Sequence, residues 1–460
     1  MIIRYVPHQC KIQLQIIVRS EVTTMDVAAQ LYNAVANDDI NTLRDLLQNG
    51  ADPDEMYQDM QNISSMNILH ICANKGRLEC AKLLVDAGAT IKIRDQWGMT
   101  PVAYSVISNY PDVTDFLLSR CPDAGNTWDK FGKAPIHSAL EYDRLECLEI
   151  LLKHSAEVNI ATMQGITPLM CLCATTDITH KKVMMSMLLD AGATIDCKDL
   201  GTKRTALQYA AIKKNVEDVE TLISMGADVN TTDASGRTPL TNVMIENIRK
   251  SSDKSKIDDD VMAIIILLIQ AGADLNMRIC EHSNPLMVAT LVGSESLMRL
   301  FLDFGASTDV NLATGITPLL AAVSQKNLSL AKLLVSSNCR LDVSGYVKVR
   351  RREEHEFDPF ELAVHLELWD FVEIFVAFGY NLSKHTYLAD SCHDQDVPAR
   401  LKDNPEMLNL LRQLASAPLS LSRIAALCVR RCLSYTVNQR VHDLPLPTAI
   451  KMDILMSDIL

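Results

Sequence analysis

Two features that would assign this chain to a familiar class of protein are missing. There is no excess of positive charge, because 44 Lys and Arg stand against 57 Asp and Glu, and the net charge is −13. Nucleic-acid binding needs concentrated positive charge, so the composition argues against it and favours basic or mixed-charge protein partners. The apolar runs, such as Ile12–Val18 and Val261–Gln270, are too short to cross a bilayer, so we expect no membrane insertion.

The residue patterns of catalytic and metal sites are also missing. We find no phosphate-binding loop, no Gly-x-Ser-x-Gly and no His-Glu-x-x-His in a setting that supports catalysis. Thirteen Cys are scattered, and neither the Cys171 and Cys173 pair nor Cys392-His393 makes a four-ligand zinc pattern. We expect a non-enzyme with no metal and no cofactor. Free Cys are typical of a reducing compartment, which predicts a cytoplasmic protein, with the nucleus as the open alternative.

What the chain does have is internal repetition. The block RTPL at Arg237–Leu240 recurs in variant forms, such as ITPL at Ile166–Leu169 and at Ile316–Leu319. If the Pro position sets the register, there are ten units, and five of the nine spacings are 33 or 34 residues. The ten register residues are Gln30, Ile68, Pro101, Pro135, Pro168, Ala206, Pro239, Pro285, Pro318 and Pro359.

Each repeated element has a physical reason. Thr before Pro is a helix N-cap, and Pro costs no hydrogen bond at the first helical position. Small residues such as Ala210-Ala211 let helices approach closely, and a second helix carries paired leucines such as Leu83-Leu84. A Gly then ends that helix in a left-handed cap, as at Gly226. The pattern predicts helix, loop, helix and hairpin, repeated, in an all-α array that folds by stacking its units.

The end of the chain carries two further apolar features. Pro418–Leu433 predicts an amphipathic helix, and the Leu444–Pro447 segment LPLP predicts a stiff extended arm. A wide apolar stripe exposed to water is a liability, so we expect the helix to meet a partner. The alternative is that this helix only caps the repeats. The apolar stripe and its flank contain Leu421, Ile424, Ala425, Cys428 and Val429.

These residues resemble a known family. The repeats, from about Asp26 to Leu382, resemble ankyrin repeats. The tail resembles a SOCS box, because Ser420, Leu421, Ala425 and Val429 occupy the places of its first motif, and the second motif, Leu-Pro-aliphatic-Pro, is matched in full. Two positions depart from the pattern: Ala425 stands where Cys is typical, and Asp453 stands where an aromatic residue is common. The whole chain is similar to the ankyrin repeat and SOCS box family.

The resemblance implies a substrate receptor of a cullin–RING ubiquitin ligase. The helix at Leu421, with Ile424, Ala425, Cys428 and Val429, would bind elongin C within the elongin B–C heterodimer. The arm formed by Leu444, Pro445, Leu446 and Pro447 would favour cullin-5, whose RING protein supplies the chemistry. The expected division is an N-terminal extension at 1–25, ankyrin repeats at 26–382, a connecting segment with a helix at 383–415 and a small helical SOCS box at 416–460.

The client protein has no signature in the sequence, so its site is a hypothesis. Trp97 and Trp128 fall in consecutive hairpins, Phe131 has the register of Trp97, and Tyr57 lies in the preceding hairpin. Exposed rigid aromatics are typical anchors of binding energy, so we expect these four residues to hold the client. The alternative is that the rings only pack on the neighbouring hairpin. For the whole chain, the alternative function is a non-enzymatic ankyrin scaffold that tethers cytosolic proteins.

Overall fold

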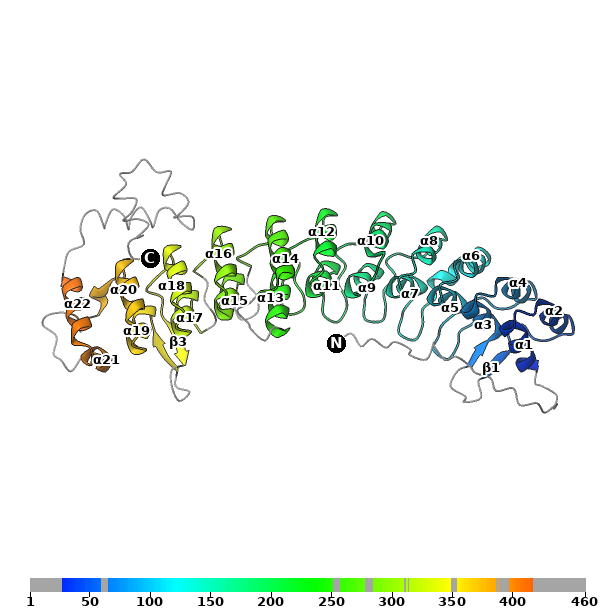
Figure 1. Cartoon of the computed structure of the whole chain (residues 1–460), viewed down its shortest axis with the longest axis horizontal. Helices are drawn as coiled ribbons and strands as arrows, with labels where there is room; N and C mark the ends of the chain where they lie inside the picture. The colour runs from blue at the N-terminus through cyan, green and yellow to red at the C-terminus, as the bar shows by residue number, and fades with distance from the viewer. Residues whose placement is uncertain are drawn as a thin grey trace. The chain divides into compact units, whose positions relative to one another are not determined.

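The computed structural model describes residues 27–58, 65–250, 257–277, 284–309, 312, 314–348, 354–385, 388 and 397–416. Contacts divide the chain into two compact units, Met1–Glu157 and Val158–Leu460, which are described separately below. In both units the described residues form helix–loop–helix pairs joined by finger-like loops, as the repeats predict (Figure 1).

The first unit holds four of the helix pairs and one short antiparallel hairpin, in which Tyr57 of one strand faces Met66 of the other. Its elements are α1 (Val27–Ala36), α2 (Ile40–Gln48), β1 (Met56–Gln58), β2 (Ser65–Asn67), α3 (Ile68–Lys75), α4 (Leu78–Asp86), α5 (Pro101–Ile107), α6 (Pro111–Arg120), the 3-10 helix η1 (Pro122–Asn126), α7 (Pro135–Glu141) and α8 (Leu145–Lys153).

The second unit holds six helix pairs, one antiparallel hairpin and a group of short elements after the last pair. Its helix pairs are α9 (Pro168–Ala174) and α10 (Lys181–Asp190), α11 (Ala206–Ile212) and α12 (Val216–Ser224), α13 (Pro239–Lys250) and α14 (Asp259–Gln270), α15 (Pro285–Val292) and α16 (Glu295–Asp303), α17 (Pro318–Ser324) and α18 (Leu328–Ser336), and α19 (Pro359–His365) and α20 (Trp369–Ala377). The other elements are β3 (Gly345–Lys348), β4 (Glu354–Phe357), η3 (Leu382–Lys384), α21 (Ala399–Lys402) and α22 (Pro405–Ser416).

The first helix of a pair begins where its cap places it. Nine of the ten described first helices start at the register residue of their repeat; α1 differs, since it already includes Val27. Most caps work as the sequence predicts: the side chain of Asn284 accepts a hydrogen bond from Met287 N–H at 2.8 Å. Thr100 is different, because it forms no side-chain cap and its hydroxyl lies 3.2 Å from that of Thr127.

The second helix of a pair ends in a left-handed residue, which turns the chain toward the next finger. Gly226 and Gly272 have φ of 88° and 89°, and where the repeat lacks Gly, Ser155 and Asn338 take the same conformation at 60° and 62°. The third repeat breaks the rule. Its helix α6 stops at Cys121 with φ −146°, because Pro122 follows and disfavours helical backbone before it, and η1 replaces the usual loop.

The core of each unit lies between successive pairs. In the first unit α1, α3, α5 and α7 pack in order, as do α2, α4, α6 and α8, and in the second unit the first helices from α9 to α19 do the same. The second leucine of each predicted pair is fully buried, which is worth about 1.5–3 kcal/mol per side chain. These leucines are Leu84, Leu151, Leu268 and Leu334.

Candidate partner-binding surface

The finger between α4 and α5 is built around one carboxylate. Asp95 Oδ1 accepts hydrogen bonds from Trp97 N–H and Met99 N–H, both at 2.8 Å, and its Oδ2 accepts from the Tyr104 hydroxyl at 2.8 Å. Gly98 turns the chain at φ +76°. Three bonds to one buried side chain hold the turn in a single conformation, and the Trp97 ring stays 45% exposed at its tip.

The next finger, between η1 and α7, repeats this construction. Asp129 Oδ1 accepts from Phe131 N–H at 2.8 Å and from Lys133 N–H at 2.9 Å. Phe131 therefore stands at the tip, 54% exposed, in the position that Trp97 has one repeat earlier. The shared register of the two rings follows from the shared Asp, which sets the same turn in both fingers.

The two fingers are joined to each other through their backbones and one side chain. Lys130 N–H donates to the Trp97 carbonyl at 2.9 Å, and a Cβ at Gly98 would lie only 3.1 Å from the Lys130 nitrogen, so the close approach depends on glycine. The Arg94 guanidinium lies 5.6 Å from the Trp128 ring centroid, a cation–π contact that crosses from one finger to the next. The first unit thus presents a paired, pre-ordered surface.

We call Arg94, Trp97, Trp128, Lys130 and Phe131 the aromatic finger patch. Trp128 is 51% exposed, so each of the three aromatic residues of the patch leaves about half of its surface open to solvent. Packing on a neighbouring hairpin therefore accounts for the buried part of each aromatic side chain, and the exposed part is available to a partner. Tyr57, the fourth predicted residue, lies in β1, and the structure gives no account of its side chain.

Two exposed apolar fingertips were missed by sequence reasoning. Met163 and Leu200, in the second unit, are 66% and 64% exposed, and Leu200 N–H donates to the Gln164 carbonyl at 2.9 Å. Aliphatic side chains are common throughout this chain, so the residue type alone does not distinguish these two from core residues. Their position before a turn glycine, as at Gly165, was the available signal.

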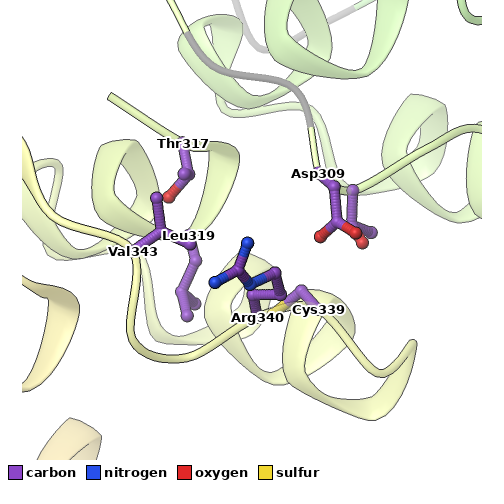
Figure 2. A pocket seen from close by; sticks show the side chains of 7 residues that line it. Asp309, Thr317, Leu319, Cys339, Arg340 and Val343 are labelled. Atoms are coloured by element: carbon purple, nitrogen blue, oxygen red, sulfur yellow. The ribbon is translucent and has the colours of Figure 1, made fainter. Parts of the chain in front are cut away.

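One small pocket lies in the second unit and has a volume of about 80 Å³ (Figure 2). Ligand pockets usually measure about 300–1,000 Å³, so this one is too small for a cofactor. Its lining mixes charged groups, such as Arg340 and Asp309, with apolar ones, such as Leu319 and Val343. The residues that line it are Thr308, Asp309, Thr317, Leu319, Cys339, Arg340 and Val343.

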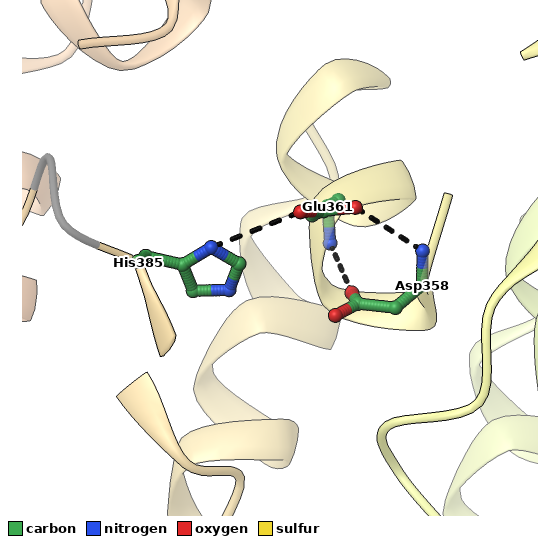
Figure 3. A group of neighbouring side chains, drawn as sticks. All are labelled: Asp358, Glu361 and His385. Carbon is green, nitrogen blue, oxygen red and sulfur yellow. Dashed lines mark hydrogen bonds and ion pairs between the residues drawn. The ribbon is translucent and has the colours of Figure 1, made fainter. Parts of the chain in front are cut away.

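Asp358, Glu361 and His385 form the one group of possible metal ligands among the residues that the structure describes (Figure 3). Hydrogen bonds within the protein account for the two carboxylates. Asp358 Oδ1 accepts from Glu361 N–H at 2.8 Å, Glu361 Oε2 accepts from Asp358 N–H at 3.3 Å, and the Tyr380 hydroxyl donates to Asp358 Oδ2. This is the capping box of α19, so we interpret the group as structural.

Burial dominates the electrostatics of this cap. It raises the pKa of the Glu361 carboxyl, helped by the nearby Asp358 charge, and it lowers the pKa of His385. The His385 ring stacks on Phe360 at 5.1 Å between centroids, and its Nε2 lies 2.9 Å from the Tyr380 hydroxyl. A neutral ring in an aromatic stack is suited to packing the last repeat, and it needs no ion.

The predicted elongin-binding and cullin-binding residues lie outside the described residues. The described chain ends with α22, whose start is capped by Asn404 through a 3.2 Å hydrogen bond from Met407 N–H. None of the helices in the described ranges is long and apolar enough to span a membrane. The residues concerned are Leu421, Ile424, Ala425, Cys428 and Val429 for elongin and Leu444, Pro445, Leu446 and Pro447 for cullin-5.

A family model for ankyrin repeats matches residues 31–127, 69–162, 161–233 and 257–344, which together make up more than half of the chain. The chain belongs to the ankyrin repeat family. This agrees with the helix pairs, the capped first helices and the fingers described above, and it confirms the ankyrin part of the resemblance. Ankyrin arrays bind other proteins, so a protein partner is the general expectation for this chain.

Relatives of this ankyrin protein have different overall functions. It is 28% identical to human Transient receptor potential cation channel subfamily A member 1 over 294 residues, which are 61% of this chain and 24% of that protein. It is 29% identical to human Ankyrin repeat and SOCS box protein 16 over 219 residues, 48% of this chain and 46% of that protein. The chain thus spans about a quarter to a half of the length of these relatives.

Among solved structures, the chain resembles the ankyrin repeat domain of Bcl-3, a member of the IkappaB protein family. The sequence identity is 25% and the TM-score is 0.44, and the match covers 51% of this chain and 96% of that domain.

Proposed function

We propose that this ankyrin protein is the substrate-recognition subunit of a cullin–RING ubiquitin ligase that contains elongin B, elongin C and cullin-5. The observation that carries the proposal is the tail that follows the repeats. Ser420, Leu421, Ala425 and Val429 have the spacing of the first SOCS motif, and the arm from Leu444 to Pro447 matches the second. The similarity to a relative named for ankyrin repeats and a SOCS box supports it.

The proposed division of labour follows from the two ends of the chain. The aromatic finger patch holds the client, and the tail holds the ligase. The chain itself is non-catalytic: it raises the effective concentration of client lysines near the ubiquitin-charged enzyme that the RING protein brings. Such a subunit acts in the cytoplasm, where thiols stay reduced. This suits the free thiols of the described part of the chain, which include Cys72, Cys80, Cys121, Cys147, Cys173 and Cys197.

The test is co-purification of the full chain with elongin B and elongin C. Wild type should give a stoichiometric complex, and Leu421→Asp should abolish it, because a carboxylate in the apolar stripe cannot be buried without a partner. The matched control is Arg423→Asp, which introduces the same side chain at a position outside the apolar stripe and should leave the complex intact. No complex with wild type, or an unchanged complex with Leu421→Asp, would contradict the proposal.

The cullin part of the proposal has its own test. Replacing Leu446 and Pro447 together with Ala should leave elongin binding intact and weaken capture of cullin-5 about tenfold or more, because the stiff arm loses its shape and an anchor. The measurement is binding of purified cullin-5 to the ternary complex by biolayer interferometry. Equal binding by the variant would assign cullin-5 selection to another part of the chain.

A second candidate function is a scaffold that tethers proteins without a ligase. The ankyrin repeats favour it, since the same repeats give similarity to a cation channel subunit, a protein of another class. The elongin experiment separates the two functions: a scaffold whose tail caps the last repeat binds no elongin, and its Leu421→Asp variant loses thermal stability instead.

A further inference from the structure

Four positively charged side chains lie in the two fingers that carry the aromatic finger patch. Lys92 and Arg94 precede the Asp95 turn, and Lys130 and Lys133 lie in the Asp129 turn. Two of them are already paired: Lys92 Nζ lies 3.2 Å from Asp123, and Lys133 Nζ lies 2.7 Å from Glu141. Arg94 and Lys130 are exposed and form no ion pair with any residue that the structure describes.

Of the two carboxylates within these fingers, that of Asp95 is buried and that of Asp129 is half-buried. Asp95 is buried and its oxygens are occupied by two backbone N–H groups and the Tyr104 hydroxyl. Asp129 Oδ1 receives two backbone N–H groups of its own turn. Bound N–H groups offset the negative charge of each carboxylate locally. What the tips present to a partner is therefore two unpaired cations and three half-exposed rings.

This local charge is opposite in sign to the charge of the chain, which carries a net −13. Two fingers of the second unit lack this combination of cations and rings. Thr162–Ile166 has no charged residue, and the following finger has exposed Lys198 and Lys203 but no aromatic side chain. A positive, aromatic patch attracts a negatively charged partner. The acidic remainder of the chain would repel a partner that is acidic throughout, whereas a short acidic segment avoids most of that repulsion.

We infer that the aromatic finger patch binds an acidic, extended segment of the client protein, with Arg94 and Lys130 pairing its carboxylates and the rings of Trp97, Trp128 and Phe131 receiving its apolar side chains. Arginine beside an aromatic ring offers a flat, forked donor that suits a carboxylate. An extended peptide in the polyproline II conformation has three residues per turn and advances about 3.1 Å per residue, so side chains three apart lie on one side and reach neighbouring fingers, which stack about 9–10 Å apart.

The inference rests on the proposed function only in assuming that a client is held at these fingers. It differs from the expectation of a basic or mixed-charge client that the composition of the whole chain suggests, because a partner meets the charge of the patch and not the average. Single-stranded nucleic acid also combines negative charge with groups that stack on rings. A protein segment is favoured, since two unpaired cations are few for a phosphate backbone and the rest of the chain is acidic.

The experiment is selection from a phage-displayed library of random short peptides on the full-length chain, followed by fluorescence anisotropy with the selected peptides. Peptides that depend on the patch are those that bind the wild type and do not bind a variant with both Trp97→Ala and Trp128→Ala. We expect these to be rich in Asp and Glu with interspersed apolar residues. Replacing Arg94 and Lys130 together with Glu should lower their affinity about tenfold, and raising the salt concentration should weaken binding of the wild type.

The matched control is Arg44→Glu with Lys82→Glu, which changes the net charge equally on helices α2 and α4 of the same unit and should leave peptide affinity unchanged. Patch-dependent peptides that are neutral or basic, no patch-dependent peptides at all, or equal loss in the control would overturn the inference. So would patch-dependent binding of a fluorescent oligo-dT strand that outcompetes the selected peptides. Elongin binding is measured on the same variants, so failure of this inference and failure of the ligase proposal remain distinguishable.

Discussion

His70 and Gln208 make equivalent hydrogen bonds in two different repeats. His70 Nδ1 lies 3.3 Å from the N–H of the cap residue Asn67, and its Nε2 lies 3.0 Å from the Met99 carbonyl in the next finger. Gln208 Oε1 accepts from the N–H of the cap residue Thr205 at 3.0 Å, and its Nε2 donates to the Arg237 carbonyl at 2.9 Å. Each side chain thus ties a helix start to the finger that follows.

The substitution His70→Gln should keep these bonds and remove a dependence on pH. Burial lowers the pKa of His70 below its ordinary value of 6.5, so the folded chain favours the neutral ring. The stability gained from this is fully present above pH 6.5 and is lost as the pH falls through the lowered pKa, by about 1.4 kcal/mol for each unit of difference. The variant should melt like wild type at pH 7.5 and at a higher temperature than wild type at pH 5.

Thermal unfolding followed by circular dichroism at the two pH values checks this prediction. His355→Gln, at an exposed position in β4, is the control and should leave the difference between the two pH values unchanged. A wild type and a His70→Gln variant with the same pH dependence would show that protonation of His70 does not affect the stability of the fold.

At the scale of elements, the helix starts could be predicted and one buried ion pair could not. Lys181 at the start of α10 and Asp218 in α12 lie 2.5 Å apart, with side chains only 9% and 5% exposed. The Lys181 ammonium also donates to the Thr175 carbonyl at 2.8 Å. Burial raises the pKa of Asp218 even though Lys181 opposes the shift. Nothing in the sequence distinguishes these two residues from ordinary surface charges, because their burial depends on how α10 packs on α12.

The substitution Lys181→Met should destabilise the second unit by about 3–5 kcal/mol at pH 7, because it leaves a buried carboxylate without its partner. The raised pKa sets the sign of the pH effect. Stability tied to protonated Asp218 is fully present below the unfolded pKa and is lost as the pH rises through the folded pKa. Without Lys181 that pKa rises further, so the variant should lose less stability at pH 4.5 than at pH 7.

Urea unfolding at both pH values measures the loss, and two further variants interpret it. Lys182→Met removes the neighbouring exposed pair, 3.5 Å from Glu217, and should cost less than about 1 kcal/mol. Lys181→Met combined with Asp218→Leu should recover most of the lost stability, because no charge is left buried. A Lys181→Met variant as stable as the Lys182→Met variant would mean that water reaches the pair.

At the scale of the whole molecule, binding of the client and binding of the ligase are assigned to different parts of the chain, so they should be separable. Replacing Trp97 and Trp128 with Ala should abolish capture of a client while elongin B–C still co-purifies. Because both rings are about half exposed, the melting temperature should fall by only a few degrees. Co-purification from cells and a melting curve on the same preparation check both parts.

The corresponding control is Tyr110→Ala. This ring lies against Gly76, where an added Cβ would meet it at 2.3 Å, so it packs between repeats and away from the finger turns. Its loss should lower stability and leave client capture unchanged. A double tryptophan variant that collapses the fold would show that the rings are structural, which was the alternative considered for them.

The sequence alone determined what is local and periodic in this protein. The ten helix pairs, nine of the described first-helix starts, the glycine turns and the ankyrin repeats all follow from residues a few positions apart, whose capping and backbone preferences act without tertiary context. The SOCS box, by contrast, stays a prediction from motif spacing alone.

Only the tertiary structure decided what depends on residues a whole repeat apart. Arg94 contacts Trp128, Lys130 meets the backbone of Trp97, and Lys181 is buried against Asp218 because stacking brings one repeat onto the next. The charge that a partner meets at the fingers is set by which carboxylates accept hydrogen bonds within their own turns and by which cations remain unpaired. Composition averages over the whole chain and cannot report that choice, so the acidic composition did not reveal the positive charge beside the aromatic rings.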